Sequence, residues 1–273
     1  MRFLSLLHFE WKRVSKVYFF LFGLVSAIQL IAIYVLASTQ AAHFTNEALI
    51  TNVSLEQIAE SYSIRWEYLY SELPIIGSIM MAIAIMLVYS LLIWYRDWLG
   101  KNNVITRLLM LPINRAQLFA AKLFLLFLLV LGLVALQIVL AAIGNKIIEA
   151  VVPSELFLAP LTMAQVMQTN RLFGLLIPLD PFVFVLAYGL GFAFLTALFS
   201  AILLERSFRI KGALLGALYL AFVFWLNSFF FMSDLYGRVF PSEALLIAVA
   251  TGLTTVVLSS WLSIYLIRKK VSA

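Results

Sequence analysis

The chain contains no cysteine and few charged residues. Of its 273 residues, only 12% are Asp, Glu, Lys or Arg, about half the share usual in soluble domains. Without cysteine there is no disulfide, no thiolate chemistry and no Cys-ligated metal site. Hydrophobic residues make up 64% of the chain, more than a soluble core of this size can bury. The composition therefore excludes an ordinary soluble domain and indicates a membrane protein.

Six long stretches contain no Asp, Glu, Lys or Arg. They are residues 17–37, 74–95, 123–144, 182–204, 212–232 and 244–267. Each meets the roughly 20 residues, at ~1.5 Å rise per residue, that a helix needs to cross the hydrocarbon core. The stretches are apolar on every side, whereas barrel strands alternate with polar lumen positions. We therefore predict an all-α integral membrane protein with six transmembrane helices, forming a single transmembrane domain over residues 1–273.

The positive charges are divided unequally between the two sides of the predicted membrane. One side receives 15 of the 19 Lys and Arg residues with three acids, and the other receives four with ten acids. Because basic flanks resist translocation, the first side is predicted to be cytoplasmic, and it includes both termini. This distribution accounts for the net charge of +6 without nucleic acid. The predicted location is a plasma membrane of bacterial type.

The N-terminal segment, residues 1–16, is too long and too amphipathic for a simple signal peptide. Its apolar residues recur at steps of three and four: Phe3, Leu4, Leu7, Trp11 and Val14. Its charged residues fall largely elsewhere on a helical wheel: Glu10, Lys12, Arg13 and Lys16. The pattern predicts an amphipathic helix lying at the cytoplasmic membrane surface. The alternative is a helix that simply extends the first span into water.

Two loops on the outer side, residues 38–73 and 145–181, are longer than ordinary helix connections and are expected to contain structure. Ser54 and Gln57 have the Ser/Thr-x-x-Gln spacing that caps the first free amides of a helix, and so do Thr162 and Gln165. A short helix is therefore predicted to begin after Ser54.

The predicted spans contain little that supports catalysis or ion coupling. No span holds an Asp, Glu, Lys, Arg or His residue. The polar amides within the spans are Gln29, Gln137 and Asn227, which either bond between helices or line a substrate path. The two histidines, His8 and His43, lie on opposite sides of the predicted membrane and cannot share a metal. The sequence also lacks a phosphate-binding loop, so this chain is not expected to hydrolyse ATP.

The segment between the second and third spans combines apolar and basic residues. Its apolar residues form a stripe at Leu99, Val104, Leu108 and Leu111, and its basic residues are Arg96, Lys101, Arg107 and Arg115. Pro112 interrupts any regular helix. The mixture fits a helix that docks on a partner protein, and it also fits an ordinary basic cytoplasmic loop.

This segment resembles the permease subunits of type-2 ATP-binding-cassette (ABC-2 type) exporters. In that family an acid and a glycine follow the second span. The sequence Leu-Leu-x-Leu-Pro-Ile-x-Arg then precedes a lysine that enters the third span. Residues 108–115, Leu-Leu-Met-Leu-Pro-Ile-Asn-Arg, and Lys122 match this pattern, while the acid is Asp97 where Glu is more usual. The local motif covers less than a tenth of the chain, but the span number and the basic N-terminal segment agree with the family.

The resemblance implies an ABC transporter permease, not an enzyme, that exports an amphipathic or hydrophobic substrate such as a peptide, an antibiotic or a lipid-like compound. A cytoplasmic coupling helix between spans two and three would dock on a separate ATPase. The implied coupling residues are Asp97, Gly100, Lys101, Arg107, Leu108, Leu111, Pro112 and Arg115. The implied partners are ATP-binding-cassette ATPase subunits, a second identical or homologous permease, and membrane lipid. ATP and Mg²⁺ are expected on the ATPase, with no cofactor in this chain.

Two other functions remain open from the residues alone. The chain could be a membrane scaffold or immunity subunit that binds an ATPase or a regulatory partner without transport. It could also be a membrane-embedded enzyme acting on lipids through outer acids, namely Glu67, Glu72, Asp180 and Asp234, although these resemble solvated loop charges.

Overall fold

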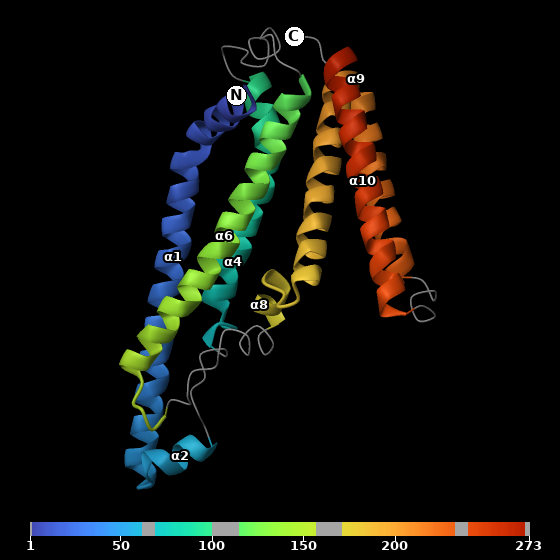
Figure 1. Ribbon diagram of the computed structural model, residues 1–273. Coiled ribbons are helices and arrows are strands. Elements are labelled where there is room, and N and C mark those ends of the chain that lie inside the picture. The colour runs from blue at the N-terminus through green and yellow to red at the C-terminus, as the bar shows by residue number, and fades with distance from the viewer. Residues whose placement is uncertain (1, 62–68, 100–114, 157–170, 233–239, 271–273) are drawn as a thin grey trace. The chain divides into compact units, whose positions relative to one another are not determined.

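The computed structural model describes residues 2–61, 69–99, 115–156, 171–232 and 240–270, and all regular structure within these ranges is α-helical. Figure 1 labels the helices. Their bounds are α1 Arg2–Thr51, α2 Leu55–Ser61, α4 Leu73–Leu99, α6 Arg115–Val151, α8 Arg171–Leu176, α9 Pro181–Met232 and α10 Pro241–Lys269.

Five of these helices, α1, α4, α6, α9 and α10, are long and apolar enough to cross a membrane. Together they contain all six stretches that the sequence predicts as spans, because α9 contains both 182–204 and 212–232. An all-helical fold typical of a multi-pass membrane protein is therefore confirmed. The N-terminal segment is helical and continues into the first span without a break, so residues 2–51 form one helix.

Helix α9 folds back on itself at Arg209. This residue has φ 56° and ψ −130°, which are not helical angles. On either side of the break the two halves pack closely, since a Cβ added to Gly216 would lie 2.9 Å from the carbonyl oxygen of Ala201. A Cβ added to Gly212 would come closer still and collide with the carbonyl oxygen of Leu204. The absence of a side chain at both glycines allows the two halves of α9 to approach as an antiparallel pair.

The chain divides into two compact units. The first unit comprises Met1–Arg13, Leu87–Leu128 and Phe182–Ala273, and the second unit comprises Val14–Met86 and Leu129–Pro181. An aromatic cluster forms part of the core of the first unit, where Phe199 meets Trp94 and Phe119 edge to face at centroid distances of 5.6 and 5.9 Å. Such contacts stabilise helix pairs beyond simple burial.

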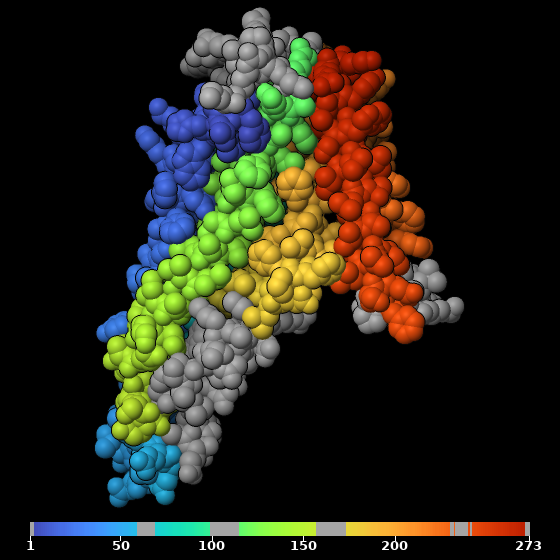
Figure 2. Space-filling view, in the orientation of Figure 1, coloured from blue at the N-terminus to red at the C-terminus, as the bar shows by residue number. Residues whose placement is uncertain are grey.

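Helix α10 joins α9 through buried hydroxyl groups in the first unit. Thr255, Ser259 and Ser263 recur every four residues on one buried face of α10. The hydroxyl of Ser200 donates to the carbonyl of Ser259 and lies 2.8 Å from the hydroxyl of Ser263. From the other half of α9, the hydroxyl of Tyr219 lies 2.6 Å from that of Ser259. The side chains of α10 and of the first half of α9 meet in the space-filling view (Figure 2). These hydroxyls hold three helical segments together without charge.

The second unit is held by tyrosines that donate to helix carbonyls. The hydroxyl of Tyr18 donates to the carbonyl of Leu129 at 3.1 Å, and that of Tyr70 donates to the carbonyl of Leu140 at 2.9 Å. Each tyrosine reaches α6 beside a glycine, because Cβ atoms added to Gly132 and Gly144 would collide with the two hydroxyls. The small residues thus make room for the hydrogen bonds.

Helix α2 begins with the predicted cap. The amide of Gln57 donates to the hydroxyl of Ser54, and the amide of Ser54 donates to the side-chain oxygen of Gln57, both at 3.3 Å. This reciprocal pair is a capping box, so the prediction at Ser54 is confirmed. The equivalent prediction at Thr162 lies outside the described residues.

Candidate functional site: a buried charge cluster

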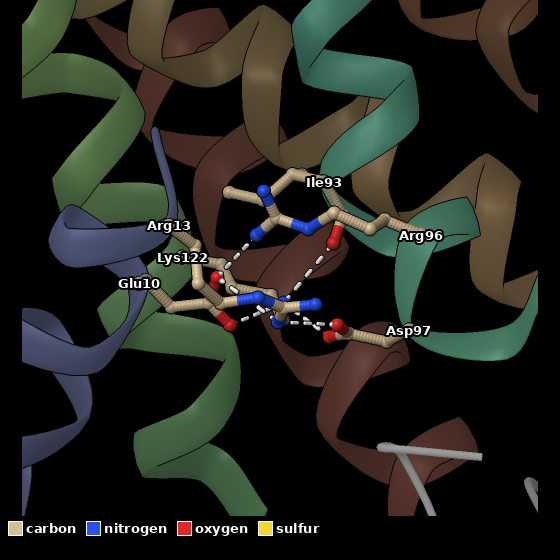
Figure 3. Close-up of polar contacts among 6 residues, drawn as sticks. All are labelled: Glu10, Arg13, Ile93, Arg96, Asp97 and Lys122. Atoms are coloured by element: carbon tan, nitrogen blue, oxygen red, sulfur yellow. Dashed lines mark hydrogen bonds and ion pairs between the residues drawn. The ribbon is translucent and has the colours of Figure 1, made fainter. Parts of the chain in front are cut away.

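A cluster of five charged side chains lies within the first unit. The charge cluster consists of Glu10, Arg13, Arg96, Asp97 and Lys122 (Figure 3). Glu10 and Arg13 come from α1, Arg96 and Asp97 from the end of α4, and Lys122 from α6. Three helices that are distant in sequence therefore meet through ionised groups.

Lys122 lies at the centre of the charge cluster and uses all three of its ammonium protons. Its Nζ donates to Oε1 of Glu10 at 2.7 Å, to Oδ2 of Asp97 at 2.6 Å and to the carbonyl of Ile93 at 3.1 Å. The same Nζ lies 5.3 Å from the centroid of the Trp94 ring, within the range of a cation–π contact. Lysine has three donors and no acceptor, so this environment satisfies it completely.

The second oxygen of each carboxylate accepts from an arginine. Arg13 donates to Oδ1 of Asp97 at 2.7 Å, and Arg96 donates to Oε2 of Glu10 at 2.8 Å. Arg13 also lies 3.7 Å from that oxygen of Glu10. Each arginine therefore binds a carboxylate on the other helix, and the two ion pairs join α1 to α4.

Because the centre of the charge cluster is buried, each of its charges depends on the presence of the others. The side chains of Glu10, Asp97 and Lys122 have no exposed surface, whereas those of Arg13 and Arg96 are 22% and 29% exposed. Desolvating three charges is costly, and the cost is offset only while each charge keeps its partners. Removing one buried partner leaves an uncompensated charge, which typically costs about 3–5 kcal/mol.

The residues of the charge cluster flank the segment that carries the family resemblance. Asp97 lies two residues after the second predicted span and Lys122 directly precedes the third, and the two side chains form an ion pair across 25 positions of sequence. Most of the predicted coupling residues lie in the intervening part of the chain, outside the described residues: Gly100, Lys101, Arg107, Leu108, Leu111 and Pro112.

Arg115 lies at the first position of α6 and contacts the end of α10. Its guanidinium donates to the carbonyls of Ile267 and Arg268 at 2.7 and 3.2 Å. The last carbonyls of a helix have no partner within the helix and attract a cation. Arg115 therefore has a structural contact of its own, which any test of its predicted coupling role must take into account.

Sequence reasoning misplaced Glu10. The helical wheel put it on the polar face of the N-terminal segment, but it is completely buried, and Leu4 of the predicted apolar stripe is 66% exposed. The buried face contains Leu6, Glu10 and Val14, and it continues without interruption into the buried face of the first span. Extending the four-residue spacing of that span backwards would have identified Glu10.

The three polar amides of the predicted spans are all at least partly buried. Gln29 of α1 donates to the hydroxyl of Ser78 of α4 at 2.8 Å within the second unit. Asn227 of α9 donates to the hydroxyl of Thr255 of α10 at 3.1 Å within the first unit. Gln137 is 5% exposed, and its side-chain oxygen accepts no hydrogen bond from the described residues. Two of the three amides therefore bond between helices.

The described residues contain no group of three or more His, Asp and Glu side chains arranged to hold a metal ion. His43 is exposed and lies 3.9 Å from Glu47 of the same helix. In the charge cluster the ammonium of Lys122 and both carboxylates are fully paired, whereas Nε of Arg96 is buried and donates to no acceptor among the described residues. The paired centre suits holding helices together more than binding a ligand.

Comparison of the chain with protein-family models, with curated proteins and with solved structures gives no match.

Proposed function

We propose that this chain is the membrane-spanning permease subunit of an ABC-2 type exporter. The charge cluster is the observation that supports this function most directly. It ties the N-terminal helix to both ends of the segment between α4 and α6, and in the resembled family that segment docks on the ATPase. The ion pair between Asp97 and Lys122 holds the two ends of this segment together. Such a connection suits a segment that must transmit movement between a partner and the spans.

Six spans with both termini in the cytoplasm complete the proposal. The reversal at Arg209 supports counting α9 as two spans, because its halves pack side by side in opposite directions. An even number of spans puts both termini on one side. The excess of Lys and Arg in the segments on that side favours the cytoplasm.

ATP binding and hydrolysis belong to a separate partner in this proposal. Closure of two ATPase subunits would move the coupling segments of two permease subunits and bias the spans between inward and outward states. The N-terminal part of α1 would move with the coupling segment, because Glu10 binds the same lysine as Asp97. The exported substrate is amphipathic or hydrophobic in this proposal.

A membrane scaffold or immunity subunit is the second candidate. The fully paired centre of the charge cluster at Lys122 favours it, because a rigid support for a partner needs no transport path. The two functions differ in one measurable respect, since a scaffold would bind an ATPase without changing its turnover in response to a substrate.

Co-expression with candidate ATP-binding subunits tests the proposal. The complex would be isolated in lipid, and ATPase activity and co-purification compared for wild type, Arg107→Ala and Arg115→Ala. We expect Arg107→Ala to lose coupled activity at unchanged thermal stability. Arg115→Ala should lose both activity and stability, because it also removes the contacts with Ile267 and Arg268. Lys146→Ala, at an exposed lysine paired with Glu149, serves as the charge-matched control.

The results separate the candidates. Stable complexes whose ATPase activity falls in Arg107→Ala but not in Lys146→Ala support the permease. A stable complex whose turnover responds to neither substitution and to no amphipathic compound supports the scaffold. If no ATP-binding subunit co-purifies with the wild-type chain, both ATPase-dependent functions are wrong.

A further inference from the structure

A polar pocket lies at the break of α9, within the first unit. We call it the turn pocket, and its volume is about 450 Å³. Among the described residues, its lining comes from α4 and α9 and comprises Trp98, Glu205, Arg206, Arg209, Ile210 and Ala213. None of these residues belongs to the charge cluster, and the proposed transport function assigns them no role.

Arg206 is fixed in the turn pocket by aromatic rings. Its guanidinium carbon lies 4.5 Å from the ring centroid of Tyr95 and 5.2 Å from that of Trp98. Stacking of this kind orients the planar guanidinium and leaves its in-plane N–H groups available to an acceptor. The Nε of Arg206 is buried and donates to no acceptor among the described residues. A buried donor without a partner is costly, and an anion in the turn pocket would remove that cost.

Arg209 holds a backbone conformation that favours glycine. Its φ of 56° is uncommon for a residue with a Cβ, and strain of this kind typically costs about 1–3 kcal/mol. A glycine would form the same turn without that cost. Backbone strain of this kind clusters at ligand-binding sites, and the side chain of Arg209 lines the turn pocket.

The positive charges of the turn pocket are not cancelled by its acid. Glu205 accepts a hydrogen bond from the hydroxyl of Tyr95, which directs its carboxylate toward α4. The two arginines, Arg206 and Arg209, outnumber this one carboxylate, and the exposed Lys211 lies two residues after Arg209. The ammonium of Lys270 lies 5.9 Å from the ring centroid of Phe208, one residue before the break. The local excess of positive charge attracts anions.

The neighbours of the two arginines suit a lipid better than a soluble anion. Ile210, between Arg209 and Lys211, is 89% exposed, and Phe208 is 40% exposed. The break separates two halves of α9 that are each apolar along their length. A turn between two membrane-crossing segments lies at the level of the lipid headgroups, where exposed apolar side chains face acyl chains and arginines face phosphates.

We propose that the turn pocket binds the phosphate of an anionic phospholipid headgroup. Arg206 and Arg209 contact the phosphate oxygens, and Ile210 lies against the acyl chains. This site rests on the part of the proposed function in which α9 crosses the membrane twice, but it is independent of any ATPase. Phosphate oxygens accept the planar, multiple donors of arginine, which makes the phosphate the expected point of contact.

Thermal unfolding of the purified full-length chain in a neutral detergent tests the site. Short-chain phosphatidylglycerol, short-chain phosphatidylcholine and inorganic phosphate would each be titrated, and a ligand that binds the folded state raises the unfolding temperature. We expect phosphatidylglycerol to stabilise the chain at lower concentration than either of the other two. Arg209→Gly should weaken this effect at least about fivefold, the share expected of one arginine at an anionic surface. It should leave the lipid-free chain as stable as wild type or more stable.

Arg206→Gln is expected to weaken phosphatidylglycerol binding as well, and Lys146→Gln, which removes an exposed lysine from α6, is expected to leave it unchanged. If Arg206→Gln fails to fold because its stacking is lost, Arg209→Gly decides the question alone. Equal stabilisation of wild type, Arg209→Gly and Lys146→Gln by phosphatidylglycerol overturns the proposal. Stabilisation by inorganic phosphate at the same concentration as phosphatidylglycerol overturns the assignment to lipid and identifies free phosphate as the ligand.

Discussion

Both units of this protein contain neutral hydrogen bonds between helices, but the completely buried charges among the described residues lie in the first unit. In the second unit, neutral tyrosines donate to backbone carbonyls beside glycines, and Gln29 donates to Ser78. In the first unit, two carboxylates and an ammonium are completely buried, and two arginines complete their pairing. Neutral bonds between small surfaces are enough to hold helices in an apolar environment. The charge cluster is therefore more than packing requires, and under the proposed function its position beside the predicted coupling segment gives it a role in coupling.

The largest expected effect is the loss of the central lysine. Lys122→Ala removes the group that both buried carboxylates share, and it should destabilise the chain by about 3–5 kcal/mol. Chemical unfolding in detergent micelles measures the change. Lys146→Ala, at an exposed lysine, should change stability by no more than about 0.5 kcal/mol. Similar values for the two variants would mean that the charge cluster is not the electrostatic centre of the first unit.

The next effect tests the glycines of the second unit. Gly144→Ala would bring a Cβ within 2.7 Å of Ile33 and into the hydroxyl of Tyr70, so it should cost about 1–3 kcal/mol by overpacking. Gly23→Ala is the matched control, because nothing lies near a Cβ at that position. The control should be neutral or slightly stabilising, since alanine is the better helix former. The same unfolding assay applies, and equal destabilisation by both substitutions would refute close packing at Gly144.

A smaller effect is expected from the tyrosine hydroxyls. Tyr70→Phe removes the hydrogen bond to the carbonyl of Leu140 but leaves the ring in its edge-to-face contact with Phe173. The expected cost is about 1 kcal/mol. A cost as large as that of Lys122→Ala would remove the contrast between neutral and charged contacts.

The smallest effect on stability should come from replacing all three fully buried charges together. Glu10→Leu, Asp97→Leu and Lys122→Met in one chain remove the three completely buried ions together, and such replacements are often neutral. Arg13 and Arg96 lose their carboxylate partners, but their side chains are 22% and 29% exposed, so water can hydrate them. Under the proposed function this variant should insert and fold but lose coupling to its ATPase. ATPase activity of the purified complex measures that loss, and full activity would show that the charge cluster is not needed for coupling.

Much of the helical arrangement could be predicted from the sequence because uncharged stretches of membrane length leave few alternatives. All six predicted stretches are helical, and the break at Arg209 lies between the fourth and fifth stretches, 182–204 and 212–232. The cap at Ser54 was predictable because it depends on side chains only three positions apart. Local signals of this kind require no knowledge of tertiary contacts.

The charge cluster could be predicted only in part. The family resemblance identified Asp97 and Lys122 as separate motif positions, but nothing in the sequence indicates that their side chains form an ion pair. Glu10 was assigned to the polar face because a charge is normally exposed, and this rule fails where two other helices supply partners. The buried hydroxyls at Thr255, Ser259 and Ser263 were also missed, although their four-residue spacing is visible once the helix is known.

A double-mutant cycle between Glu10 and Lys122 tests the central claim most directly. The claim is that the N-terminal part of α1 and the start of α6 are joined through one buried ion pair. Free energies of unfolding would be measured for wild type, Glu10→Gln, Lys122→Met and the double variant. The account predicts an interaction energy above about 1.5 kcal/mol, within the range of residues that share a network. Additive effects within about 0.5 kcal/mol would contradict it, because the two residues would then act independently.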